Sequence, residues 1–288
     1  MSAIKELNYH PDISARSFKT GKKYTVGLIV PNIGSGFFAS FIEDTEAILQ
    51  QKKYRVIISN THEDEKLELE NIKFLCSGMV DGLIICSSMK DYETIRPIIK
   101  SKKMPVVFVE RSSNHCPFDS VMISDYNSTS NSIEYLIENG HTKIGFIYGS
   151  ASISPLSERI NAYIDTMNKY GIEINSSFIK EVQFNTYEAT KSLIESECTA
   201  IVSSTNRSTI DSILYCINNN ISIKNDINLI GYLNDDYEST NLTKIPVVLH
   251  PIKDMASQAV KLIINRINNI DSPVKNVILL SKFVKPIN

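Results

Sequence analysis

The stretch that decides the fold is residues 25–59, which read TVGLIVPNIGSGFFASFIEDTEAILQQKKYRVIIS. It begins with the apolar run Thr25–Val30 and ends with a second such run, Arg55–Ser59. Between them, over 37–52, apolar residues recur at three- and four-residue steps, which is the period of an amphipathic helix. Strands that are nearly all apolar are typical of parallel strands covered on both faces. The stretch therefore predicts a strand–helix–strand unit of an α/β fold.

The same alternation continues along the chain. Further strands are predicted at Gly82–Cys86, Val106–Val109, Lys143–Tyr148, Phe178–Val182, Ala200–Ser203, Asn228–Tyr232 and Val247–Leu249. Helices are predicted near 37–52, 65–77, 92–101, 128–139, 157–170, 187–196, 207–219 and 252–268. So many strands in 288 residues favour two doubly wound parallel-sheet lobes over one sheet. Such sheets bind ligands at the carboxyl ends of their strands, which predicts a cleft between the lobes.

The predicted seam between the lobes lies near Asn139-Gly140-His141, where a helix ends at a glycine and a strand begins. Residues 24–140 with 250–274 are predicted to form the N-terminal lobe, because the helix at 252–268 could return to the first sheet. Residues 141–249 with 275–288 would form the C-terminal lobe, and residues 1–23 would precede both.

Composition excludes several classes of protein. With 22% charged and 42% hydrophobic residues the chain is an ordinary globular one. Its apolar runs are too short to span a bilayer, and no export leader is visible at the N-terminus. Five scattered cysteines without a CxxC pair indicate free thiols in a reducing cytosol. The five histidines show no HExxH spacing, so neither a metal nor a cofactor is predicted.

Charge is uneven along the chain. Residues 1–23 carry five basic and two acidic side chains, a net charge of +3. The whole chain has 30 basic and 32 acidic residues and a net charge of −2, so the remainder is −5. A basic end on an acidic body suggests a separate partner for that end. The alternative is a solvated tail.

Motifs for catalysis and phosphate binding are weak. Gly34-Ser35-Gly36 precedes a helix, so its amides could face an anion, although a tight turn is favoured over that role. There is no GxGxxG, no GK[ST], no GxSxG elbow and no Ser-His-Asp order. We therefore expect no enzyme, although an α/β enzyme whose site is assembled only in space stays a rival.

The N-terminal residues carry a specific pattern. Residues 7–21 read LNYHPDISARSFKTG, followed by TVGLIVP at 25–31 and FFA at 37–39. Together with Val80-Asp81-Gly82, Gly140-His141 and Ile230-Gly231-Tyr232, their order and spacing resemble the LacI/GalR family of transcription regulators. The resemblance covers the whole chain. It implies a periplasmic-binding-protein-like effector core, preceded by the last part of a helix-turn-helix headpiece.

The resemblance also implies a DNA-binding hinge that includes Ala15, Arg16 and Phe18. Phe18 stands where the family places a leucine wedge that kinks the minor groove of operator DNA. The alternative is that Phe18 packs on the effector core. Because most of a headpiece is missing, this sequence alone is expected to bind an operator weakly.

Effector-binding positions follow from the same resemblance. They are Phe37, Phe38, Ser87, Arg159, Phe184 and Asn206, although at least one of the two adjacent phenylalanines is expected in the core. Two aspartates of the family pattern are replaced here by Arg207 and Leu233, and Asn234 or Asp235 could substitute if the loop shifts. The loss of these carboxylates leaves room for a phosphorylated or acidic effector held by Arg159 and Arg207.

The resemblance thus implies a cytoplasmic, homodimeric transcription regulator that binds operator DNA and senses a small metabolite such as a sugar or sugar derivative. Repression is the family's commoner role. The principal alternative is a solute-binding protein of a transport system, which has the same two-lobed form but would carry an export leader and lack residues 15–18.

Overall fold

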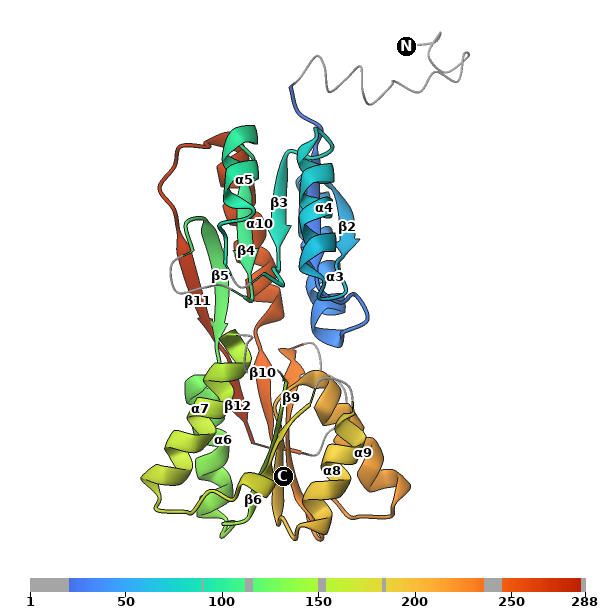
Figure 1. Ribbon diagram of the computed structural model, residues 1–288, viewed down its shortest axis with the longest axis vertical. Coiled ribbons are helices and arrows are strands. Elements are labelled where there is room, and N and C mark those ends of the chain that lie inside the picture. Colours follow the sequence, from blue (N-terminus) through green and yellow to red (C-terminus); the bar gives the residue numbers. More distant parts are fainter. Residues whose placement is uncertain are drawn as a thin grey trace.

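The chain folds into two α/β lobes stacked along the long axis of the molecule (Figure 1). The computed structural model describes residues 21–89, 91–111, 116–149, 154–182, 185–235 and 245–285. Each lobe contains one six-stranded sheet with helices on both faces. The predicted architecture of two doubly wound sheets is confirmed.

The N-terminal lobe has the strand order β11-β5-β4-β3-β1-β2, and every neighbouring pair is parallel. Its strands are β1 (Thr25–Val30), β2 (Arg55–Asn60), β3 (Gly82–Ile85), β4 (Val106–Val109), β5 (Asp119–Ser124) and β11 (Asn276–Leu280). Its helices are α3 (Gly36–Gln51), α4 (Glu65–Cys76), α5 (Arg96–Lys102) and α10 (Ile252–Asn268).

The C-terminal lobe has the order β12-β10-β9-β8-β6-β7, in which only β12 runs antiparallel to its neighbour. Its strands are β6 (Ile144–Tyr148), β7 (Ile179–Glu181), β8 (Ala200–Ser203), β9 (Asn228–Asn234), β10 (Val247–His250) and β12 (Lys282–Val284). Its helices are α6 (Tyr126–Glu138), α7 (Ser154–Lys169), α8 (Thr186–Glu195), α9 (Asn206–Asn218) and the 3-10 turn η1 (Ser176–Phe178).

Helix α3 shows how the sequence pattern becomes packing. Its buried residues recur at the three- and four-residue steps seen in the sequence, and they are Phe37, Phe38, Phe41, Thr45 and Leu49. This stripe joins α10 in one core cluster on one face of the sheet, while α4 and α5 help to form a second cluster on the other face. Because both faces are covered, β3 and β4 are buried along their whole length.

The chain passes between the lobes at three places within the described residues, and these differ from the predicted boundaries. The first crossing follows β5 at Ser124–Asp125, so α6 packs on α7 in the C-terminal lobe rather than belonging to residues 24–140. The second is at His250–Pro251, and α10 returns to the first sheet as predicted. The third is at Ser281, so β11 lies in the first sheet although 275–288 was assigned to the second.

The misplaced boundaries have one physical origin. Strand β5 was not predicted, because its sequence DSVMIS carries polar residues at both ends. Because β5 was not recognised, the helix that follows it was placed in the N-terminal lobe. Buried Asp119 at the start of β5 is paired with Arg266 of α10, and the closer of its two oxygen–nitrogen contacts is 2.7 Å. Such a pairing is invisible to hydrophobic periodicity.

Candidate functional site

The three crossings meet in a buried polar junction between the lobes. Ser281 of the third crossing donates its backbone N–H to the carbonyl of Ser124 at the first, over 3.2 Å. Its hydroxyl is also hydrogen-bonded to that of Ser128 in α6. Asp125 and His250, which belong to the first and second crossings, are both buried. The side chains that join the lobes therefore lie together at the place where strand ends were predicted to form a cleft.

Arg159 of α7 is the centre of this junction. Its Nε donates to Oδ2 of Asp125 over 2.6 Å, and its Nη1 donates to the carbonyl of Ser204 over 2.6 Å. Its Nη2 lies 3.2 Å from Nε2 of His250. The predicted effector-binding arginine is thus in the junction, but it is 4% exposed and its guanidinium already holds both a carboxylate and a carbonyl.

The ionisation of Asp125 follows from its neighbours. Burial alone would raise the pKa of this carboxyl, but the charges of Arg159 and His250 outweigh burial and hold the pKa below its usual range. The N–H of Asp125 is bound by Oε2 of Glu158 at 2.9 Å, which fixes the crossing to α7. Asp125 and Arg159 therefore form a compensated buried ion pair.

Glu110, which sequence reasoning did not single out, directly follows β4. It has a φ of 62°, and the N–H of Arg111 donates to the carbonyl of Val109 across it over 2.6 Å, which makes a tight three-residue turn. The side chain is buried, and its Oε2 has no hydrogen-bond partner among the described residues. A strained backbone that holds an unpaired buried oxygen is typical of a binding position.

The environment of Glu110 contains both signs of charge. Burial raises the pKa of its carboxyl, and the charges of Arg159 and His250 lower it less than burial raises it. The signal available in sequence was a carboxylate placed directly after the all-apolar strand Val106–Val109. A single acidic residue after a strand usually looks like a solvated loop residue, which is why it was missed.

The two adjacent phenylalanines are both buried and both belong to the core cluster of the N-terminal lobe. The ring of Phe37 also reaches the junction, where it meets the His250 ring edge-on with centroids 5.6 Å apart. Phe38 stands edge-on to Phe37 at 5.1 Å. Only Phe37 is therefore placed beside the charged junction residues.

Asn206 and Asn234 are brought together, as their predicted roles require. The Nδ2 of Asn206 donates to Oδ1 of Asn234 over 3.0 Å, and both side chains are buried. Asn234 in turn donates across the lobes to α3. These residues form the C-terminal-lobe side of the junction next to Phe37.

Ser87 lies in a different polar cluster, inside the N-terminal lobe. Its hydroxyl donates to Oε1 of Glu68 over 2.6 Å, and Oε2 of Glu68 accepts from the N–H of Ser88 over 2.6 Å. Burial raises the pKa of Glu68, although both bonds lower it in part. Ser87 thus orders the loop after β3 through α4.

Arg207 is not part of the junction. Its side chain is 75% exposed, and its Nε donates to Asp211 one helical turn further along α9 over 2.9 Å. Arg159 and Arg207 are therefore not brought together in this structure, and their pairing around an acidic effector stays a prediction. Phe184 and the hinge residues Ala15, Arg16 and Phe18 lie outside the described residues.

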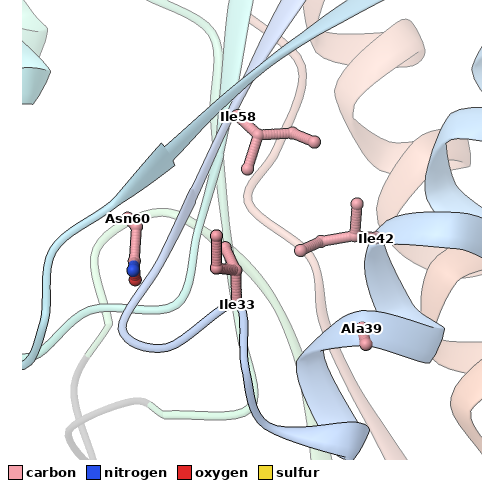
Figure 2. Close-up of a pocket in the computed structure, with 5 residues that line it drawn as sticks. All are labelled: Ile33, Ala39, Ile42, Ile58 and Asn60. Carbon is pink, nitrogen blue, oxygen red and sulfur yellow. The ribbon is translucent and has the colours of Figure 1, made fainter.

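A separate hollow of about 450 Å³ lies on the N-terminal lobe alone (Figure 2). It is formed by residues from the loop after β1, from α3 and from β2, and the lining side chains are Ile33, Ala39, Ile42, Ile58 and Asn60. None of the predicted effector-binding residues lines it. Ile33 and Ile58 are each about half exposed, so the hollow is an open apolar surface rather than the junction between the lobes.

Within the described ranges, no group of three or more His, Cys, Asp or Glu side chains is arranged to hold a metal ion. None of the helices described is both long and apolar enough to cross a membrane.

A family model and individual known proteins both match most of the chain. Residues 23–236 match the model for periplasmic binding proteins and the sugar binding domain of the LacI family. The chain is 29% identical to the "Probable HTH-type transcriptional regulator EndR" of Paenibacillus polymyxa, over 92% of this chain and 80% of that protein. It is 27% identical to catabolite control protein A of Priestia megaterium, over 95% and 85% of the two chains.

Among solved structures, a LacI family transcriptional regulator from Enterococcus faecium with bound ribose has the same fold. The TM-score is 0.82 at 22% identity, over 91% of this chain and 97% of that one. The curated relatives are transcription regulators that cover nearly the whole chain. The family model, which spans most of the sequence, and the two-lobed fold agree: the chain belongs to the family of periplasmic binding proteins and sugar-binding domains of the LacI family.

Proposed function

We propose that this chain is the effector-sensing core of a cytoplasmic, homodimeric transcription regulator without catalytic activity, and that its effector is a neutral, hydroxyl-rich molecule such as a sugar. The transcription-regulator assignment is supported by the relatives and by the pattern at residues 7–21, which a solute-binding protein of a transporter would not need. The effector assignment is carried by the unpaired buried oxygen of Glu110.

The charge balance of the junction favours a neutral effector. Arg159 is the cation at the centre of the junction, and Asp125 already compensates it at 2.6 Å. Glu110 adds a second carboxyl to the same junction. A phosphate or carboxylate ligand would meet this surplus of acidic groups, whereas a hydroxyl can donate directly to Oε2 of Glu110. The ribose-bound relative from Enterococcus faecium shows that this fold accommodates a sugar.

Lobe closure around the effector would carry the signal. The crossings at Asp125, His250 and Ser281 form the axis, since the chain passes between the lobes there. A change of the angle between the lobes would move the N-terminal lobe, which carries residues 21–25, relative to its partner in a dimer. Operator DNA bound by the preceding segment would sense that movement, and by linkage the DNA and the effector would change each other's affinity equally.

A thermal-shift screen tests the effector class. Neutral sugars, sugar phosphates, nucleobases and small acids are each added to the chain, and a ligand at 100 times its dissociation constant adds about 2.7 kcal/mol of stability. A neutral sugar is expected to raise the melting temperature. The shift should vanish in Glu110→Gln and persist in the exposed control Glu93→Gln. Stabilisation by sugar phosphates or acids alone would contradict the proposal.

A further inference from the structure

We propose that Asn234 is a positioning residue that latches the two lobes to each other directly, so that the chain itself favours the closed arrangement. The regulatory consequence rests on the proposed function, but the latch does not. Asn234 is the last residue of β9 in the C-terminal lobe and is fully buried. It lies opposite His250 in the β9–β10 ladder, so the latch adjoins the second crossing.

The orientation of the Asn234 amide is fixed from its own lobe. Its Oδ1 accepts a hydrogen bond from Nδ2 of Asn206 over 3.0 Å. Asn206 is the first residue of α9, and the capping box formed by Thr205 and Ser208 holds this helix start in place. With its oxygen bound by Asn206, the amide nitrogen of Asn234 faces the other lobe. Asn206 therefore acts as a brace rather than as an independent ligand-binding group.

The N-terminal lobe receives both protons of that nitrogen. Nδ2 of Asn234 donates to the carbonyl of Gly36 over 3.0 Å and to the hydroxyl of Ser40 over 3.0 Å. The two acceptors lie one turn apart at the start of α3, and the Ser40 hydroxyl itself donates to the Gly36 carbonyl over 3.1 Å. The donor and the acceptors of both hydrogen bonds belong to the chain itself, so the latch forms without a ligand.

These bonds are placed where they oppose opening. A hydrogen bond is lost when its partners separate by about 1 Å beyond normal length, and α3 belongs wholly to the N-terminal lobe. Each net hydrogen bond shifts a two-state equilibrium by roughly 2- to 12-fold, so two shift it by roughly 5- to 150-fold. A more populated closed form lowers the effector concentration needed for response in proportion to the fraction of the chain that is closed.

The test measures the separation of the lobes in the ligand-free chain. Spin labels are attached at Glu46→Cys on α3 and Lys191→Cys on α8, both exposed positions, in a Cys116→Ser background because the other four cysteines are buried. The labelled chain is diluted with an excess of unlabelled chain, so that each measured distance lies within one protomer. Electron–electron double resonance then gives the distance distribution for each variant.

The labelled chain with Asn234 and Ser40 intact should give mainly the short distance between the two spin labels. Asn234→Ala should raise the ratio of long to short separations roughly 5- to 150-fold, and Ser40→Ala, which removes one acceptor, roughly 2- to 12-fold. Asn219→Ala is the matched control, since this amide follows α9, donates to the Tyr215 carbonyl and the Tyr187 hydroxyl of its own lobe, and should change nothing. Melting temperatures establish that each variant is folded.

A mainly long separation in the chain with Asn234 intact would overturn the latch. An unchanged distance distribution in folded Asn234→Ala would also overturn it. If Asn234→Ala does not fold, an unchanged distribution in Ser40→Ala has the same meaning. None of these results depends on the effector or on DNA. A negative result in the distance measurement therefore does not contradict the proposed function, and a negative effector screen does not contradict the latch.

Discussion

Glu110 is buried in a left-handed turn directly after β4. Its unpaired oxygen lowers the stability of the folded state, because it has lost its hydrogen bonds to water. Its folded pKa is raised above the unfolded value of about 4.3, so the folded state binds its proton more tightly. Its contribution to stability is full below that unfolded pKa and is lost as pH rises through the folded pKa.

Glu110→Gln should therefore make the protein more stable at neutral pH, by roughly 1–3 kcal/mol, because it removes a buried group whose charge is poorly compensated. The free energy of unfolding, measured by urea denaturation at pH 5 and pH 8, should fall less between these values in the variant than in the wild type. A variant with the wild-type pH dependence, or one less stable at pH 8, would contradict this account of Glu110.

Arg159 and Asp125 carry the opposite pH dependence. Burial raises the pKa of Asp125 but Arg159 and His250 outweigh it, so the folded pKa is depressed. The stability it contributes is present above the unfolded pKa of about 3.9 and is lost as pH falls through the folded pKa. Arg159→Met should cost roughly 3–5 kcal/mol at pH 7, since it leaves Asp125 buried without its cation.

The double variant Arg159→Met/Asp125→Asn separates the ion pair from simple packing. The double variant should lose much less free energy of unfolding than the two single variants lose together, because it contains no uncompensated buried charge. Additive single effects would mean that the two side chains do not act as a pair.

At the scale of elements, β9 and α9 approach each other closely at Gly231. A Cβ at this position would lie well inside contact distance of the Thr209 methyl group of α9. Gly231→Ala should therefore destabilise the C-terminal lobe by roughly 1–3 kcal/mol through overpacking. Thr209→Ser removes that methyl while keeping the hydroxyl that accepts from the N–H of Tyr232, so it should restore part of the loss. Thermal unfolding of the single and double variants measures this, and an equally unstable double variant would place the strain elsewhere.

Most elements could be predicted from the sequence because their burial pattern is periodic. The strands at Thr25–Val30, Val106–Val109 and Ala200–Ser203 and the helix at 252–268 have the predicted ends. Strand β5 was missed because its ends are polar, whereas β11, which reads NVILL, is an apolar run that was not recognised as a strand. Periodicity also cannot say which sheet a strand joins, and this is why the crossings at Asp125 and Ser281 differ from the predicted seam.

The site was predictable only in part. Family resemblance led to Arg159, Asn206, Asn234 and Phe37, and the structure brings these into or beside one junction. It could not reveal that Arg159 is compensated by Asp125 or that Asn234 bonds to α3, because both contacts join residues far apart in sequence. Glu110 was missed because a single acidic residue directly after a strand looks in sequence like a solvated loop residue.

At the scale of the whole molecule, α9 presents an exposed apolar row of the kind that marks an interface. Ile210, Leu214 and Ile217 recur at helical spacing and are 40%, 45% and 63% exposed. We expect this row to contribute to a homodimer. Leu214→Lys should raise the dimer dissociation constant at least tenfold in sedimentation equilibrium, whereas Phe74→Lys on the other lobe should not. A wild-type monomer at micromolar concentration would contradict the dimer.

An effector bound between the lobes should change the affinity of this regulator for DNA. This is measured with the protein as its gene encodes it and with fragments of the DNA upstream of that gene. The operator dissociation constant is measured with and without the sugar that stabilises the chain, and the sugar dissociation constant with and without operator. We predict the same factor of at least fivefold in both experiments. An operator affinity that is unchanged by a saturating sugar would contradict the account.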